Sequence, residues 1–226
     1  MKIFNSIKSL KNREAGRRAF ILGNGPSILE EDLSSLGNEL TIGMNASTLL
    51  EQKFGFHTNY YVVSDTRFIT HPDKGRYATT DLHPQTIRVL REEIRDVDDR
   101  SIKNQTYYVP ALKRDGFSRD IRSGYFFGCT TTMLAIQLAY YLGVTEVYLL
   151  GCDLRYTPDS PRFYKEDNPQ LEDSFTSVQI WNISNAAQVF ASEGKQIVSC
   201  SKRSFLRPYL AYQDFSSIFD QSVAAA

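Results

Sequence analysis

Short runs of apolar and aromatic residues recur along this sequence, and segments of helical periodicity separate several of them. Most of these runs are apolar at consecutive positions, which is typical of strands buried on both faces of a parallel sheet. Strands of this kind that alternate with helices predict an α/β fold, in which helices cover both faces of a mostly parallel sheet. The strand candidates are residues 19–22, 40–44, 59–63, 106–109, 146–150 and 196–200.

Two helices are predicted clearly in the second half of the chain. Residues 130–142 have helical periodicity and are followed by Gly143, and residues 175–192 are followed closely by Gly194. Glycine is common directly after a helix because it adopts the left-handed conformation without strain.

Two further helices are expected in the first half of the chain. One should begin near Ile28, where Ser27 can cap it. The other is a charged helix from Pro84 to about Val97. The Asp96-Val97-Asp98 triplet would then end a helix, and we interpret it as solvated surface rather than as an Asp-x-Asp metal site.

Composition points to an ordinary globular protein. The chain has 226 residues, of which 42% are hydrophobic and 23% charged, so one domain with a substantial core is expected. The net charge of +0 gives no global attraction to nucleic acid. The three cysteines, Cys129, Cys152 and Cys200, are odd in number and far apart, without metal-ligand spacing. This usage fits a reducing, cytoplasmic compartment.

The first 17 residues form a basic segment in which the apolar residues Ile3, Phe4, Ile7 and Leu10 fall on one helical face. The segment has no apolar core of the kind found in signal peptides, and no run in the chain is long enough to span a bilayer. Two interpretations stay open: a solvated arm, or an amphipathic segment that contacts anionic lipid at the inner face of the membrane.

The sequence Gly23-Asn24-Gly25-Pro26-Ser27 directly follows the first strand. Two glycines allow the backbone to approach a phosphate closely, and a following helix would supply free N–H groups and a positive dipole end. Asn24 adds an amide for a base or a ribose hydroxyl. The pattern is neither a Walker A loop nor a dinucleotide fingerprint. A tight connection without a ligand is the alternative.

Other polar residues are expected at the same edge, because ligands of open α/β sheets bind beyond the carboxyl ends of the strands. Asn45 follows the second strand, Ser64 and Asp65 follow the third, and Asp153 follows the strand at 146–150. Asp153 would either bind substrate or hold neighbouring backbone N–H groups. Thr131 and Thr132 open the helix at 130–142, where they would bind an anion or simply cap the helix.

The loop after Asp153 carries Tyr156 and Tyr164, with Arg155, Arg162 and Lys165 beside them. Phenol and guanidinium donors suit a leaving phosphate, which needs charge stabilisation more than covalent chemistry. A solvated loop is the alternative interpretation.

These motifs resemble a known group of proteins. The stretches 20–27, 43–45 and 142–153 look like those of the bacterial lipooligosaccharide sialyltransferases. They look equally like the wider superfamily that holds the motility accessory factor flagellin glycosyltransferases and the archaeal-type 6-hydroxymethylpterin diphosphokinases. The resemblance implies a single Rossmann-like domain over residues 18–210, a GT-A variant, between the basic segment 1–17 and a tail at 211–226.

In the sialyltransferases the donor is CMP-sialic acid and no metal is needed, so the resemblance implies a CMP-linked sugar donor and no resident cofactor. By position, Asn24, Gly25, Ser27 and Asn45 would contact the nucleotide. Gly23, Pro26, Ser64 and Asp153 are predicted to bind it because they follow strands at the same edge of the sheet. Thr131 or Thr132 would stand near the donor. Tyr156 and Tyr164 would approximate the two tyrosines that stabilise the leaving phosphate, Tyr156 being offset by one residue.

One departure concerns the catalytic base. The resembled family has a histidine before the last long helix, and the corresponding stretch here, Leu171 to Trp181, has none. Asp65 and His71 are the candidates for a replacement. A carboxylate at Asp65 could be desolvated by the bound donor, which would raise its pKa and make it a competent base.

Three functions therefore remain. The leading one is a glycosyltransferase that moves sialic acid or a related sugar from a nucleotide-sugar donor to a bacterial surface glycan or glycolipid. The second is pyrophosphate transfer from ATP to a small heterocycle, with Mg²⁺ held by Asp65 and Asp153. The third is a non-catalytic nucleotide-binding protein. The sequence is compatible with an oligomer and does not disclose the acceptor or the linkage.

Overall fold

The computed structural model describes residues 6–99, 101–157, 161–166 and 173–220. Its main sheet has eight strands in the order β10-β9-β8-β1-β2-β3-β4-β5, and every neighbouring pair is parallel. A second, two-stranded parallel sheet pairs β6 with β7. The prediction of an α/β fold with a parallel sheet is confirmed. The strands are β1 Arg18–Leu22, β2 Leu40–Met44, β3 Tyr60–Val63, β4 Ile87–Arg91, β5 Thr106–Val109, β6 Ala111–Leu112, β7 Tyr125–Phe126, β8 Glu146–Leu150, β9 Gln196–Ser199 and β10 Ala211–Tyr212.

The connections are mostly short helices, and the two longest are those predicted from periodicity. The α-helices are α1 Thr48–Phe54, α2 Thr66–Thr70, α3 Thr131–Tyr141, α4 Thr176–Ala191 and α5 Ser217–Asp220. The 3₁₀ helices are η1 Ile7–Leu10, η2 Pro26–Glu30, η3 Leu33–Asn38, η4 Asn45–Ser47, η5 Gly75–Ala78, η6 Glu92–Asp96 and η7 Ile121–Ser123.

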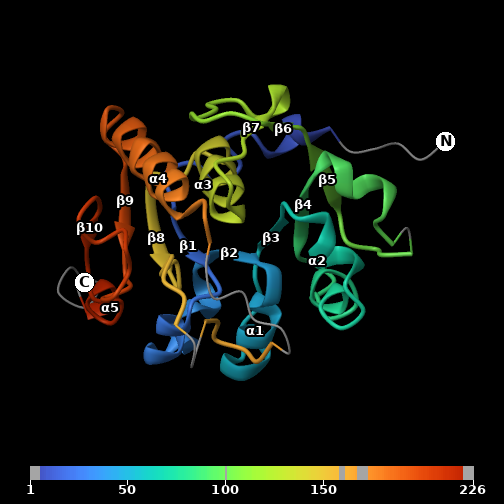
Figure 1. Ribbon diagram of the computed structural model, residues 1–226, viewed down its shortest axis with the longest axis horizontal. Coiled ribbons are helices and arrows are strands. Elements are labelled where there is room, and N and C mark those ends of the chain that lie inside the picture. Colours follow the sequence, from blue (N-terminus) through green and yellow to red (C-terminus); the bar gives the residue numbers. More distant parts are fainter. Residues whose placement is uncertain (1–5, 100, 158–160, 167–172, 221–226) are drawn as a thin grey trace.

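Helices cover the main sheet on both faces, as the uniformly apolar strands predict (Figure 1). In β1, Ala19 and Ile21 belong to the hydrophobic cluster that includes α3 and α4, whereas Phe20 and Leu22 belong to the cluster under η2, η3, α1 and α5. A third cluster packs α2 and η5 on Tyr61 and Val63 of β3. Side chains alternate along a strand, so α3 and α4 lie on one face and α1, α2 and α5 on the other.

The strand order reverses between β1 and β8. The chain runs from β1 outward through β2, β3, β4 and β5, and then returns to place β8, β9 and β10 on the other side of β1. The segments after β1 and β8 contact each other through backbone hydrogen bonds and then continue to opposite faces, to η2 and α4, at the carboxyl end of the strands. This is where ligands bind in open α/β sheets.

A helical segment is present near Ile28, as predicted, but it is a five-residue 3₁₀ helix and Ser27 does not cap it. The glycine turn opens on η2, with Gly25 as its N-cap, and the chain becomes extended at Glu31. Asp32 then accepts a hydrogen bond from Ser34 N and begins η3 as a separate turn. Local capping by Asp32 thus divides the connection, and no long helix dipole points at the glycine turn.

The predicted charged helix from Pro84 to Val97 was wrong, because this segment holds β4 and η6. Arg88, the second residue of β4, is 1% exposed and pairs with Asp98 Oδ1 at 2.6 Å and Oδ2 at 3.0 Å. Tyr108 Oη donates to the same carboxylate at 2.6 Å. The buried ion pair explains the error, because a charged residue such as Arg88 is not expected in a buried strand. Asp98 is buried as its partner, so it is not solvated surface.

The N-terminal segment packs on the core from residue 6 onward. Leu10 is fully buried in the cluster that contains α3, and Ile7 packs against the same cluster. Backbone N–H groups of Asn12 and Glu14 donate to the carbonyls of Tyr141 and Leu142 at the end of α3. These two apolar side chains are therefore turned toward the protein; Ile3 and Phe4 lie outside the described residues. No helix in the described part of the chain is long and apolar enough to span a membrane.

Candidate active site

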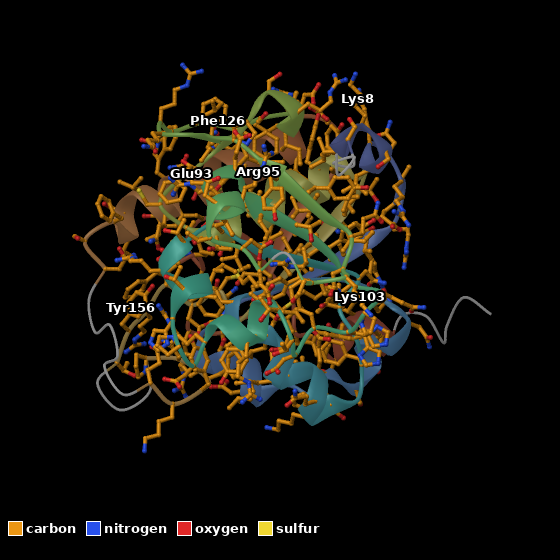
Figure 2. All side chains as sticks on the ribbon, turned by 90° about the vertical axis from the view of Figure 1, so that its right-hand side faces the viewer. Lys8, Glu93, Arg95, Lys103, Phe126 and Tyr156 are labelled. Carbon is orange, nitrogen blue, oxygen red and sulfur yellow. The ribbon has the colours of Figure 1, made fainter. Side chains whose placement is uncertain are left out.

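A cavity of about 930 Å³ opens at the carboxyl edge of the main sheet, where the strand order reverses. In Figure 2, Tyr156 and Glu93, which follow β8 and β4, lie at the left of the view. Lys103, which precedes β5, lies at the right. The cavity gathers residues more than a hundred positions apart in sequence. The predicted residues that line it are Gly23, Asn24, Gly25, Asn45, Ser64, Asp65, His71, Thr131, Thr132, Asp153, Tyr156 and Tyr164.

The glycine turn is fixed by the turn that follows β8. Gly23 N donates to Leu150 O at 2.8 Å, and Gly25 N donates to Gly151 O at 2.7 Å. A Cβ on Gly23 would collide with the carbonyl of Gly151, and one on Gly25 would collide with the carboxylate of Asp153. The glycines are thus required by protein packing, so Gly25→Val would disturb the fold and is a poor probe of ligand binding.

Asp153 and Ser27 form a buried link beneath the turn. Ser27 donates from its backbone N to Asp153 Oδ2 at 3.0 Å and from its Oγ to Oδ1, and Ser27 Oγ lies 2.9 Å from Ser201 Oγ. Asp153 is 5% exposed. Of its two predicted roles, the structure shows the one of holding neighbouring N–H groups. Ser27 and Pro26 do not line the cavity, and Ser27 lies behind the turn.

The two predicted asparagines differ in how their amides are used. Asn24 donates from Nδ2 to Met44 O and accepts at Oδ1 from Ala46 N, both at 3.1 Å, so its amide ties the turn after β1 to the turn after β2. Asn45 has φ +49°, a left-handed conformation that asparagine tolerates better than most residues. Its Oδ1 is buried without a hydrogen-bond partner among the described residues. A buried acceptor in this state is unusual, and a ligand donor would satisfy it.

The N-terminus of α3 forms another part of the cavity. Thr130 caps the helix by accepting from Thr132 N at 3.3 Å, and Thr131 Oγ1 lies 2.7 Å from Ser64 Oγ. Gly128 and Cys129, directly before the cap, both have positive φ. This sharp turn aims the positive end of an eleven-residue helix at the cavity.

The basic wall of the cavity consists of Lys74, Tyr156, Arg162, Tyr164 and Glu166. Lys74 Nζ lies 2.5 Å from Glu166 Oε1, and Arg162 Nε lies 3.9 Å from Glu166 Oε2. The Arg162 guanidinium also stacks on the Tyr156 ring, 4.6 Å from its centroid. Burial, and then the Glu166 charge, raise the pKa of Tyr164, so its hydroxyl stays protonated and can donate. Two cations and the Tyr164 hydroxyl, which lies 3.4 Å from Glu166 Oε1, face one carboxylate here.

Asp65 caps α2 and is held by Arg67. Its Oδ1 accepts from Arg67 N at 2.9 Å, and the Arg67 guanidinium contacts both carboxylate oxygens at 2.8–3.1 Å. Burial raises the pKa of Asp65, but the hydrogen bonds and charge of Arg67, with the charge of Arg91, outweigh it and leave the pKa below its ordinary value. The direction is opposite to the one argued from the sequence.

His71 presents a donor rather than a base to the cavity. Its Nδ1 accepts from the backbone N–H groups of Asp73 and Lys74, at 3.2 and 3.4 Å. The neutral ring therefore carries its proton on Nε2. To act as a base, His71 would first have to give up these two contacts.

The helix wall, formed by Cys129, Thr131, Asp173 and Gln179 at the N-termini of α3 and α4, was largely missed by sequence reasoning. Asp173 accepts from Phe175 N at 2.9 Å and from Gln179 Nε2 at 2.8 Å, and the same Nε2 donates to Cys129 O at 2.9 Å. The predicted start of a helix at Phe175 was the available signal, since a capping residue was to be expected just before it.

Arg91 was missed for a different reason. It lines the cavity at the end of β4, pairs with Glu93 at 2.7 Å and lies 5.2 Å from the centroid of the Phe127 ring. The segment had been assigned to a helix, so the residue was not expected at the carboxyl edge. A correct strand assignment would have placed it there.

The chain has an α/β fold that resembles the folds of two solved glycosyltransferase structures. It resembles the structure of the MAF glycosyltransferase from Magnetospirillum magneticum AMB-1, with a TM-score of 0.59, 15% identity and coverage of 97% of this chain and 40% of that one. It also resembles the sialyltransferase CstII from Campylobacter jejuni in complex with a substrate analogue, cytidine-5'-monophosphate, with a TM-score of 0.55, 13% identity and coverage of 88% of this chain and 85% of that one.

These similarities are structural. No protein-family model and no curated protein matches the sequence. At 13–15% identity the comparison establishes the shared fold. The chain spans about two fifths of the length of the MAF glycosyltransferase, so the activity of that whole protein is not transferred by the match.

Proposed function

We propose that this protein is a glycosyltransferase that takes a CMP-linked sugar, sialic acid or a relative, and transfers it to a bacterial surface glycan or glycolipid. The fold that it shares with two glycosyltransferases supports the reaction class, and the CMP in the CstII complex supports the nucleotide. The observation that carries the proposal is Oδ1 of Asn45, which is buried beside the glycine turn without a hydrogen-bond partner in the described part of the chain.

The nucleoside end of the donor would bind between the turns that follow β1 and β2. Asn45 Oδ1 is an acceptor, so it fits an amino or hydroxyl donor of a nucleoside. Asn24 would contribute through the shape of the turns, because both ends of its amide are used within the protein.

The phosphate of the donor would face the basic wall. Transfer breaks the bond between the sugar and the phosphate oxygen, and negative charge grows on the departing nucleotide. Arg162, Lys74 and the protonated hydroxyl of Tyr164 are fixed donors for that charge, and preorganised donors of this kind stabilise a transition state strongly. Tyr156, stacked under Arg162, would hold the guanidinium in place.

Asn45→Gly tests the nucleotide site with little disturbance of the turn. Glycine adopts φ +49° readily, so the variant removes the amide and keeps the backbone conformation. Asn12→Gly is the matched control, because Asn12 has φ +57° and lies in the N-terminal segment away from the cavity. The measurement is a thermal-shift panel of CMP, CDP, UDP, GDP and ATP, each with and without Mg²⁺.

We expect CMP to raise the melting temperature of the wild type and of Asn12→Gly, and to raise that of Asn45→Gly much less. Equal shifts of the melting temperature by CMP in all three proteins would show that the Asn45 side chain does not bind CMP. A shift by ATP that requires Mg²⁺, with none by CMP, would replace the proposal with pyrophosphate transfer.

A further inference from the structure

Among the described residues, four carboxylates line the cavity, and three of them are already engaged by other groups. Asp65 is held by Arg67 on both oxygens, and Asp153 is buried with both oxygens bound to Ser27. Glu166 pairs with Lys74 at 2.5 Å and faces Arg162. Each of these groups would have to break a strong contact before it could accept a proton.

Asp173 is the fourth, and it has no ion pair with another residue that the structure describes. Its Oδ1 accepts one hydrogen bond from Phe175 N, at 2.9 Å, and its Oδ2 accepts one from Gln179 Nε2, at 2.8 Å. A carboxylate oxygen can accept about two hydrogen bonds, so both oxygens keep capacity for a further donor. Asp173 is half-buried on the cavity wall, where such a donor could approach.

Gln179 sets the orientation of this carboxylate. It is 3% exposed, and its Nε2 donates to two acceptors, Cys129 O and Asp173 Oδ2. Because both partners are acceptors, the amide must present its NH₂ group to them. The Oε1 atom is then left buried without a partner among the described residues, beside the carboxylate. A second acceptor thus stands next to Asp173 on the helix wall.

We propose that Asp173 is the general base that activates the acceptor, an inference that rests on the proposed glycosyl transfer. A hydroxyl of the acceptor glycan donates its proton to an Asp173 oxygen. The hydroxyl oxygen forms the new bond to the anomeric carbon of the donor sugar. The bond from that carbon to the phosphate oxygen breaks, and its electron pair leaves with CMP, which the basic wall stabilises.

The test uses the full chain with CMP-sialic acid as donor and water as the acceptor, and it measures the rate of CMP release and the affinity for CMP by calorimetry. Asp173→Asn keeps the shape of the side chain and removes its basicity. Asp115→Asn is the matched control, because Asp115 also accepts a hydrogen bond from an α4 amide, that of Asn182 at 2.8 Å, but does not line the cavity.

We expect Asp173→Asn to release CMP at least about 100-fold more slowly than the wild type, with CMP affinity changed less than about threefold. Asp115→Asn should match the wild type. In Asp173→Ala, added formate should restore part of the rate, because an external carboxylate can replace a missing base but not a missing structural contact.

Near-normal CMP release by Asp173→Asn, in the presence of an active wild type, would overturn the assignment. So would a loss of CMP affinity parallel to the loss of rate, or no rescue by formate. If the wild type neither binds CMP nor releases it from CMP-sialic acid, the proposed donor is refuted, and so is the proposed role of Asp173.

Discussion

The two walls of the cavity have opposite character. The basic wall joins the segment after α2 to the loop after β8, and its cations outnumber its one carboxylate, Glu166. The helix wall joins the N-termini of α3 and α4, and its carboxylate, Asp173, is held only by neutral N–H donors among the described residues. The helices behind the walls pack on opposite faces of the sheet.

This separation matches the two demands of glycosyl transfer. The departing phosphate needs positive charge, and the attacking hydroxyl needs a group that accepts a proton. Asp173 has no ion pair among the described residues, whereas Asp65 is paired with Arg67 and Glu166 with Lys74. The comparison predicts that substitutions on the two walls affect the leaving group and the attacking group separately.

After Asp173→Asn, the largest loss of turnover is expected for Arg162→Gln. Removing this cation leaves the developing phosphate charge without its nearest guanidinium, so the turnover number should fall about 100-fold or more. Calorimetry with CMP should show weaker binding as well, which distinguishes the substitution from Asp173→Asn. Arg203→Gln, an exposed position outside the cavity, is the control. Unchanged turnover in Arg162→Gln would show that the basic wall does not face the phosphate.

A smaller effect is expected for Asp65→Asn. Asparagine can still cap α2, so the variant should lose mainly the ion pair with Arg67, which is worth less than about 1 kcal/mol of unfolding free energy, measured by denaturant titration. CMP release should fall much less than in Asp173→Asn. A drop of several hundredfold in Asp65→Asn would move the base from the helix wall to the end of β3.

The sequence was informative where local patterns decide the structure. The consecutive apolar residues of β1 and β8 and the periodicity of α3 and α4 were enough to predict a parallel α/β sheet and the edge where its ligand site lies. The same reasoning failed for β4, because the buried charge of Arg88 is satisfied by Asp98, ten residues away. A burial that depends on a distant partner leaves no periodic signal.

For the candidate site, the sequence predicted the positions of several residues but not their contacts. Residues directly after strands, such as Asn45 and Asp153, were expected at the cavity edge because parallel strands end together. The roles of Asn24, Ser27 and Asp153 within the turns depend on contacts between β1, β2 and β8 that the sequence does not display. Lys74 and Glu166 are 92 residues apart, so their pairing in the basic wall could not be foreseen.

A crystal structure with bound CMP would test the central claim most directly. The account predicts CMP in the cavity at the end of β1, with its nucleoside donating a hydrogen bond to Asn45 Oδ1 and its phosphate against Arg162 and Tyr164. Asp173 should then face the open space on the far side of the phosphate, where the sugar and the acceptor hydroxyl would meet. CMP bound outside this cavity, or bound with its phosphate against Asp173, would contradict the account.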